Sequence, residues 1–121
     1  MILVDTSVWI DHFRRGNARL ASLLDSGQVW CHDFVVGELA CGRLEHRTEI
    51  LSYLNNLPRA ATAKHAEVLG LVEDRRLSGE GLGWIDVHLL AAALIDRLSL
   101  WTRDRALHAA AKRLGIDFAD G

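Results

Sequence analysis

Four acidic side chains, Asp5, Glu38, Asp86 and Asp104, are the best candidates for chemistry in this sequence. Carboxylate oxygens are the hard ligands that Mg²⁺ and Mn²⁺ prefer, and Mg²⁺ is often held by a few carboxylates together with water and substrate phosphate. An acidic pocket of this kind suits phosphodiester hydrolysis, because a bound metal offsets the repulsion between acids and phosphate and activates water. The surrounding elements must bring the four acids to one place.

Two of these acids lie at expected junctions between a strand and a helix. Asp5 directly follows the apolar run 2–4, and Asp104 comes three residues after a predicted strand that ends at Trp101. In open parallel sheets the ligand crevice lies beyond the carboxyl ends of the strands. Each Asp could instead simply cap its helix, where a carboxylate satisfies free backbone N–H groups. Convergence of several acids at one sheet edge favours a site.

The other two acids have apolar surroundings. Asp86 lies in the first turn of the segment 84–95, which is apolar on nearly every face, and the helical neighbours of Glu38 include Phe34 and Cys41. A carboxylate shielded from water must be protonated, paired with a cation or bound to metal, because an unpaired buried charge is costly. For Glu38, neutralisation by an arginine is the alternative.

Apolar runs that alternate with helical periodicity predict an α/β fold. Parallel neighbours need crossover connections that helices supply, so we expect three α/β/α layers around a central parallel sheet of four to five strands. The strands are expected at 2–4, at 29–31, near Ala60, at 98–101 and at 116–119. The glycine-rich stretch 78–83 is expected to be a loop.

Composition favours a single domain over residues 1–121, since half of the residues are apolar and no linker interrupts the chain. The formal net charge of -2 argues against a protein that coats nucleic acid, although eight arginines could still form local phosphate-binding surface: Arg14, Arg15, Arg43, Arg47, Arg75, Arg76, Arg103 and Arg105.

The two cysteines make no disulfide framework, and neither a signal peptide nor a membrane span is evident. We expect a cytoplasmic, soluble protein.

Several other features carry less weight. His88 lies two residues after Asp86, so on a helix it points away from that acid, and the other histidines lack zinc-site spacing. Ser7 lacks the turn context of a serine nucleophile. The four tryptophans lie within apolar segments, so core packing is favoured over base stacking: Trp9, Trp30, Trp84 and Trp101.

Four segments together resemble a known family. MILVDTSVWID, FVVGELACG, GWIDVHLLAAAL and LWTRDRAL, in this order and spacing, resemble PIN-domain ribonucleases, and the overall pattern looks like a VapC-type toxin of a toxin-antitoxin pair. The resemblance covers essentially the whole chain, and no acidic position departs from it.

This resemblance implies roles for particular residues. Asp5, Glu38, Asp86 and Asp104 would form the catalytic pocket, with metal on Asp5, Asp86 and Asp104, and with Thr6 and Thr102 in support. It also implies Mg²⁺ or Mn²⁺ as cofactor, RNA (tRNA or rRNA) as substrate, a tightly bound VapB-like antitoxin and a homodimer.

Two other functions remain open at this stage. A receiver-like signalling module would use an acidic Mg²⁺ pocket to accept a phosphoryl group, but it would need a lysine after a late strand, where this chain has Thr102, Arg103 and Asp104. A PIN-like domain that only binds RNA or protein would usually lack one of the acids.

Overall fold

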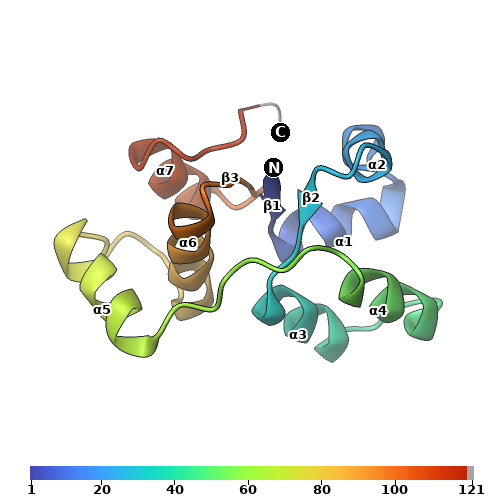
Figure 1. Ribbon diagram of the computed structural model, residues 1–121, viewed down its shortest axis with the longest axis horizontal. Coiled ribbons are helices and arrows are strands. Elements are labelled where there is room, and N and C mark those ends of the chain that lie inside the picture. Colours follow the sequence, from blue (N-terminus) through green and yellow to red (C-terminus); the bar gives the residue numbers. More distant parts are fainter. Residues whose placement is uncertain (120–121) are drawn as a thin grey trace.

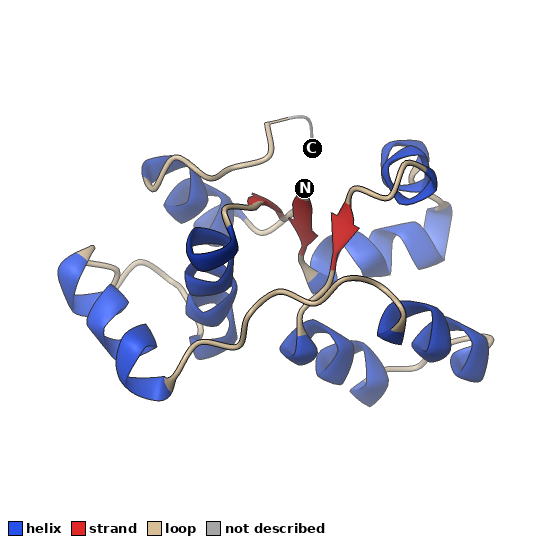
Figure 2. Ribbon diagram, viewed as in Figure 1, coloured by secondary structure: helices blue, strands red, loops and turns tan. Residues whose placement is uncertain are grey.

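The computed structural model describes residues 1–119. Short strands alternate with helices in the order β1 (Ile2–Val4), α1 (Thr6–Arg15), α2 (Ala18–Asp25), β2 (Val29–Trp30), α3 (Asp33–Cys41), α4 (Arg47–Asn55), α5 (His65–Asp74), α6 (Trp84–Asp96), β3 (Ser99–Trp101) and α7 (Arg105–Arg113). Figure 2 shows the three strands side by side with helices around them. The predicted α/β class is confirmed.

The sheet has the order β2-β1-β3, and both pairs of neighbours are parallel. In the register, Leu3 of β1 stands opposite Trp30 on one side and Leu100 on the other. In Figure 1, α5, α6 and α7 lie to one side of the strands and α1 to α4 to the other. Helices therefore flank the sheet as parallel crossovers require.

The prediction of four to five strands is wrong for the described residues, because only three strands form there. The two further segments expected to be strands, near Ala60 and at 116–119, each contribute one isolated parallel bridge, Cys31 with Arg59 and Leu100 with Asp117. On the β2 side, Cys31 N donates to Pro58 O at 2.8 Å, and Ala60 N donates to Cys31 O at 2.8 Å. Pro58 has no N–H with which to extend this ladder toward Val29, and on the other side α3 begins at Asp33.

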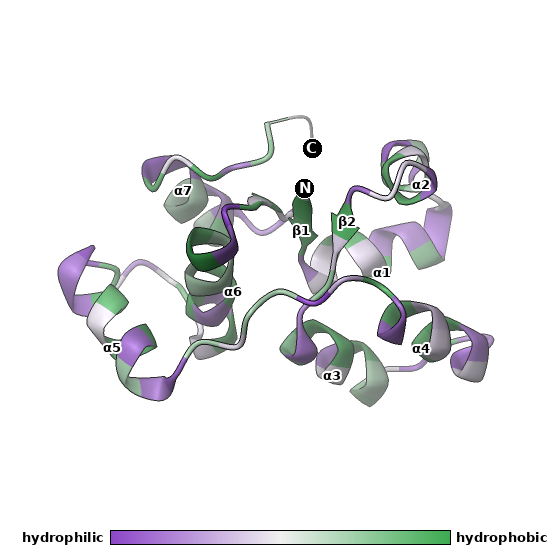
Figure 3. Ribbon diagram, in the orientation of Figure 1, coloured by the Kyte–Doolittle hydropathy of each residue, from purple (hydrophilic) through white to green (hydrophobic). Residues whose placement is uncertain are grey.

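The core is built around β1 and α6. All three residues of β1 are buried, and so is every residue of α6 from Val87 to Ala93. Both elements are coloured largely as hydrophobic in Figure 3. Burial on both sides explains why these sequences are apolar without alternation, as in central parallel strands and in enclosed helices. In residues 1–119, no helix is long and apolar enough to cross a bilayer.

The tryptophans differ in how deeply they are buried, and Trp30 is half-buried against the core. Trp9 and Trp101 are buried as predicted, with 1% and 3% of their surface exposed. Trp84 is 41% exposed at the start of α6, so its predicted place in the core is wrong. The apolar run to which it belongs enters the core only from Val87 onward, one turn later.

Candidate active site

Asp5 lies directly after β1 and is the N-cap of α1. Its Oδ2 accepts hydrogen bonds from Ser7 Oγ and from Thr102 Oγ1, both at 2.7 Å, and a longer one from Ser7 N at 3.4 Å. Only 7% of the residue is exposed. Capping and burial therefore occur together here, and the hydroxyl groups offset the cost of burying the carboxylate.

Thr102 links Asp5 to Asp104. The Thr102 hydroxyl donates to Asp5 and accepts from Asp104 N at 3.0 Å, directly after β3. Asp104 is the N-cap of α7, and its Oδ2 accepts from Leu107 N at 2.8 Å. The buried Thr102 hydroxyl thus connects the carboxylate after β1 to the backbone after β3.

Glu38 lies on α3 and reaches toward the start of α1. Its Oε1 accepts a hydrogen bond from Thr6 Oγ1 at 2.6 Å. Glu38 itself is exposed, so the shielding expected from its apolar helical neighbours is absent. The contact nevertheless attaches α3 to the β1 end of the site, across 32 positions of sequence.

Asp86 lies in the first turn of α6 and is half-buried. Burial is the largest cause that raises the pKa of Asp86, and the hydrogen bond from Gly83 N, at 2.8 Å, opposes it. The negative charges of Asp5, Asp104 and Glu38 raise this pKa further. The structure therefore places Asp5, Glu38 and Asp104 close enough to Asp86 for their charges to act on its carboxylate, which is the convergence expected from the sequence.

The four carboxylates share one arrangement. Each has one oxygen engaged by protein donors: Asp5 Oδ2, Glu38 Oε1, Asp86 Oδ2 and Asp104 Oδ2. Within residues 1–119, the second oxygen of each acid accepts no hydrogen bond from the protein. Each side chain is therefore oriented by one oxygen while the other remains available as a ligand.

This donor set fits a divalent cation that is hard and oxygen-seeking. The three side-chain charges acting on Asp86 are all negative, and a cation between them would relieve their repulsion. Over residues 1–119, no three His, Cys, Asp or Glu side chains lie close enough together to hold a metal ion by themselves. Mg²⁺ does not need such a cage, since it is usually bound through one or two carboxylates with water and substrate phosphate completing its shell.

The resemblance implied only that Thr6 and Thr102 support the acids, and each does contact one of them, Glu38 and Asp5. The part played by Ser7 was not expected from the sequence. The Ser7 hydroxyl donates to Asp5 and accepts from Arg103 N at 3.0 Å, so it ties the start of α1 to the loop after β3. A serine two residues after an N-cap aspartate is the signal that could have suggested this contact. His88 was expected only to point away from Asp86; its ring contacts aromatic side chains, and its centroid lies 4.7 Å from that of Phe34.

Two cavities adjoin Glu38. One has a volume of about 670 Å³ and is mainly apolar, with the lining Asp33, Phe34, Gly37, Glu38, Cys41, Trp84 and Ile85. The other, of about 230 Å³, has two cationic side chains among its lining residues, Ile10, Phe13, Arg14, Glu38, Leu39, Gly42, Arg43 and Leu44. We call them the aromatic cavity and the basic cavity.

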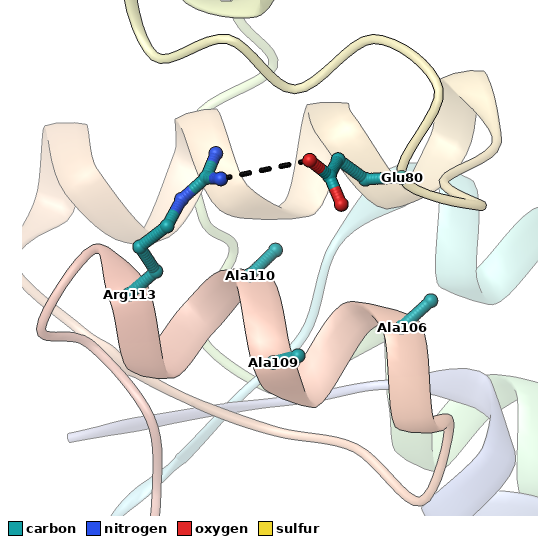
Figure 4. A pocket seen from close by; sticks show the side chains of 5 residues that line it. All are labelled: Glu80, Ala106, Ala109, Ala110 and Arg113. Atoms are coloured by element: carbon teal, nitrogen blue, oxygen red, sulfur yellow. Dashed lines mark ion pairs between the residues drawn. The ribbon is translucent and has the colours of Figure 1, made fainter.

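A third cavity, of about 250 Å³, lies against α7 and is shown in Figure 4. Three alanines of that helix line it together with Glu80 and Arg113, whose charged groups approach to 3.8 Å. None of the four acids lines this cavity. Its small apolar walls and its ion pair give it no chemistry comparable with that of the acidic site.

Residues 2–113 match the sequence model of the PIN domain, so this chain belongs to the PIN-domain family. It is also 47% identical over 121 residues to the protein named Ribonuclease VapC32 of Mycobacterium tuberculosis, in strains CDC 1551 / Oshkosh and ATCC 25618 / H37Rv, covering 99% of this chain and 98% of the relative. These findings confirm the resemblance to VapC-type PIN domains. The family assignment also argues against the receiver-like alternative.

Solved structures share the fold at lower sequence identity. PAE2754 from Pyrobaculum aerophilum superimposes with a TM-score of 0.65 at 18% identity, covering 90% of this chain and 83% of that one. FitAcB from Neisseria gonorrhoeae gives a TM-score of 0.61 at 22% identity, covering 93% and 94%. FitAB bound to an IR36 DNA fragment gives 0.62 at 17% identity, covering 93% and 91%.

Proposed function

We propose that this chain is a metal-dependent endoribonuclease that hydrolyses RNA phosphodiester bonds and acts as the toxin of a toxin-antitoxin pair. The observation that carries the proposal is the set of four neighbouring carboxylates, each oriented through one oxygen and open at the other. The ribonuclease name of the relative that is 47% identical supports RNA as the substrate. Its designation as VapC supports a VapB-like antitoxin as the partner.

Asp5, Asp86 and Asp104 would hold Mg²⁺ or Mn²⁺ through their open oxygens. When bound, the metal lowers the pKa of water to supply a nucleophile and offsets charge on the scissile phosphate. Asp5 is buried and held by two hydroxyls, so it presents its open oxygen in a fixed direction. Asp104 is held to the same unit through Thr102.

Glu38 is suited to handle the proton of the attacking water. It is exposed, and Thr6 holds only its Oε1, which leaves Oε2 to orient the water or to accept its proton. In-line attack of this water on phosphorus leaves a 5′-phosphate on one fragment and a 3′-hydroxyl on the other. The proton goes from the water to Glu38, and the departing 3′-oxygen takes a proton from solvent.

The test is to sequence RNA 5′ ends after brief expression of the chain without its antitoxin. We expect one dominant new 5′-phosphate end, in a tRNA or a ribosomal RNA, that is absent when Asp5→Asn is expressed at the same level. New ends of equal abundance with Asp5→Asn would contradict the proposal. A folded wild-type chain that produces no new end would favour the alternative, a PIN-like domain that only binds its partner.

A further inference from the structure

Trp84 is exposed on the wall of the aromatic cavity, beside the acidic site. It opens α6 two residues before Asp86, and the cavity that it lines also contains Glu38. Trp84 shares this wall with Phe34 and Ile85, and ligand sites are lined mainly by apolar and aromatic side chains of this kind together with a few polar groups. The position of this ring next to the catalytic acids makes the substrate the natural candidate.

Neighbouring rings fix the orientation of Trp84. His65 lies at 5.1 Å between ring centroids, and the ring of His88 meets it at 5.0 Å and 85° in an edge-to-face contact. Phe34 in turn meets His88 at 4.7 Å and 72°. Trp84 and Phe34 are thus linked through His88, so that two aromatic side chains from α6 and α3 are positioned before any ligand arrives.

The charges at this cavity suit a nucleobase better than a phosphate. The lining contains two carboxylates, Asp33 and Glu38, and no cationic side chain, so it disfavours phosphate but can accept hydrogen bonds from the N–H groups of a base. Within residues 1–119, Asp33 is paired with Arg59 at 3.4 Å, which leaves Glu38 as the unpaired carboxylate. The basic cavity, which shares Glu38 as a lining residue, contains Arg14 and Arg43, which suit the backbone phosphates. The volume of about 670 Å³ is within the range of small-ligand sites.

We propose that the aromatic cavity binds one unpaired nucleobase of the RNA next to the scissile phosphate, with Trp84 as its stacking surface. This proposal rests on the proposed ribonuclease function and names the kind of RNA that the site accepts. A base within a duplex cannot present its face to Trp84, so the substrate must be single-stranded or unstacked at this position. Trp84 is then a substrate-contacting residue that sets where the strand is cut.

The test compares wild type, Trp84→Leu and Trp84→Phe on a single-stranded RNA oligonucleotide carrying the mapped cleavage site. A parallel series removes one base at a time around the scissile bond. Tyr53→Leu is the matched control, because Tyr53 is 49% exposed on α4 and does not line the cavity. Trp84 is itself exposed, so its replacement should leave the fold intact.

We expect Trp84→Leu to lower kcat/KM about 10- to 100-fold, as loss of one base–aromatic stack predicts, whereas Trp84→Phe and Tyr53→Leu stay within about threefold of wild type. One RNA that lacks a single base should lower kcat/KM of wild type about as much as Trp84→Leu does on intact RNA. The same missing base should cause no further loss in Trp84→Leu. Normal cleavage by Trp84→Leu would overturn the proposal. So would an abasic series in which every missing base lowers cleavage by Trp84→Leu as much as it lowers cleavage by wild type. Normal cleavage together with weakened antitoxin binding would instead assign the cavity to the protein partner.

Alkylation of Cys41 gives a second readout that does not require cleavage. Cys41 is exposed on the cavity wall, whereas Cys31 is buried and burial raises the pKa of its thiol, so a thiol reagent should label Cys41 selectively. In the Asp5→Asn protein, intact RNA should slow this labelling, and the same RNA without the critical base should not. Equal labelling with both RNAs would overturn base binding. A wild type that cleaves no RNA would refute the proposed function separately, and the labelling would still decide whether the base binds.

Discussion

The two halves of the acidic site are held in different ways. The inner half, Asp5 with Ser7 and Thr102, is held by buried or half-buried hydroxyl groups that join β1, α1 and β3. In the outer half, Glu38 and Asp86 each accept one hydrogen bond and come from separate helices, α3 and α6. The inner half is therefore arranged in advance by the protein, whereas the outer half carries unrelieved negative charge and should respond most to a cation.

Replacement of Asp5 by Asn is expected to have the largest effect on cleavage. Asn keeps the size of the side chain and one acceptor oxygen but removes the charge, so RNA cleavage should fall at least about 100-fold. Circular dichroism should show an intact fold. Near wild-type turnover by the purified variant would mean that the inner half has no direct part in the chemistry.

Replacement of Asp86 by Asn should separate catalysis from stability. Cleavage should fall by a similar order, about 100-fold, because a proposed metal ligand is lost. Without metal, the melting temperature should rise by a few degrees, because repulsion from the other three acids is removed.

The size of this stability change depends on pH. Because the folded chain raises the pKa of Asp86 above its ordinary value of 3.8, the folded state holds the proton more tightly than the unfolded state. Stability of the wild type relative to the variant should therefore decline as pH rises above that value. Added Mg²⁺ should stabilise the wild type more than the variant, and thermal scans across pH with and without metal measure both effects. Equal metal responses would remove Asp86 from the ligand set.

Replacement of Thr102 by Val tests how much the inner half depends on one hydroxyl. Val keeps the shape but leaves Asp5 Oδ2 and Asp104 N each without this partner, which should destabilise the fold by about 1–3 kcal/mol. Cleavage should fall about 10-fold, since the buried Asp5 loses one of its two side-chain donors. Thr102→Ser retains the hydroxyl and should recover most of both losses. No difference between the two variants in chemical denaturation and cleavage assays would contradict this role.

Replacement of Thr6 by Val should have the smallest effect. It removes the single hydrogen bond to the exposed Glu38, so we expect a loss of cleavage of only a few-fold and a melting temperature close to that of wild type. The fall should lie in kcat, because Glu38 is proposed to act on water and not on RNA binding. A loss as large as that of Thr102→Val would show that the outer half is no less pre-arranged than the inner one.

Much of the candidate site could be predicted from sequence because the residues that mark each acid lie close to it along the chain. Asp5 and Asp104 follow strands and cap helices, and Asp86 interrupts an apolar helix, so each can be recognised within a few residues of itself. The hydroxyl contacts join residues about 95 positions apart, as Ser7 and Arg103 do, and no periodicity reveals them. Trp84 was misplaced because hydropathy does not show where an apolar helix emerges from the core.

The prediction of four to five strands was wrong for a related reason. The segments near Ala60 and at 116–119 have strand-like composition, but whether a segment pairs once or over a ladder depends on the partner available at the sheet edge. The resemblance of this sequence to a family does not give the length of pairing at each sheet edge either. In contrast, the order of strands and helices is fixed by apolar runs and N-cap residues that are visible along the chain.

The central claim is that these carboxylates hydrolyse RNA with a divalent metal, and end-group analysis of the products tests it most directly. A defined single-stranded RNA should be cut by the purified chain only when Mg²⁺ or Mn²⁺ is present. The fragments should carry a 5′-phosphate and a 3′-hydroxyl. Cleavage that persists in excess chelator, or that leaves a 2′,3′-cyclic phosphate, would contradict the claim.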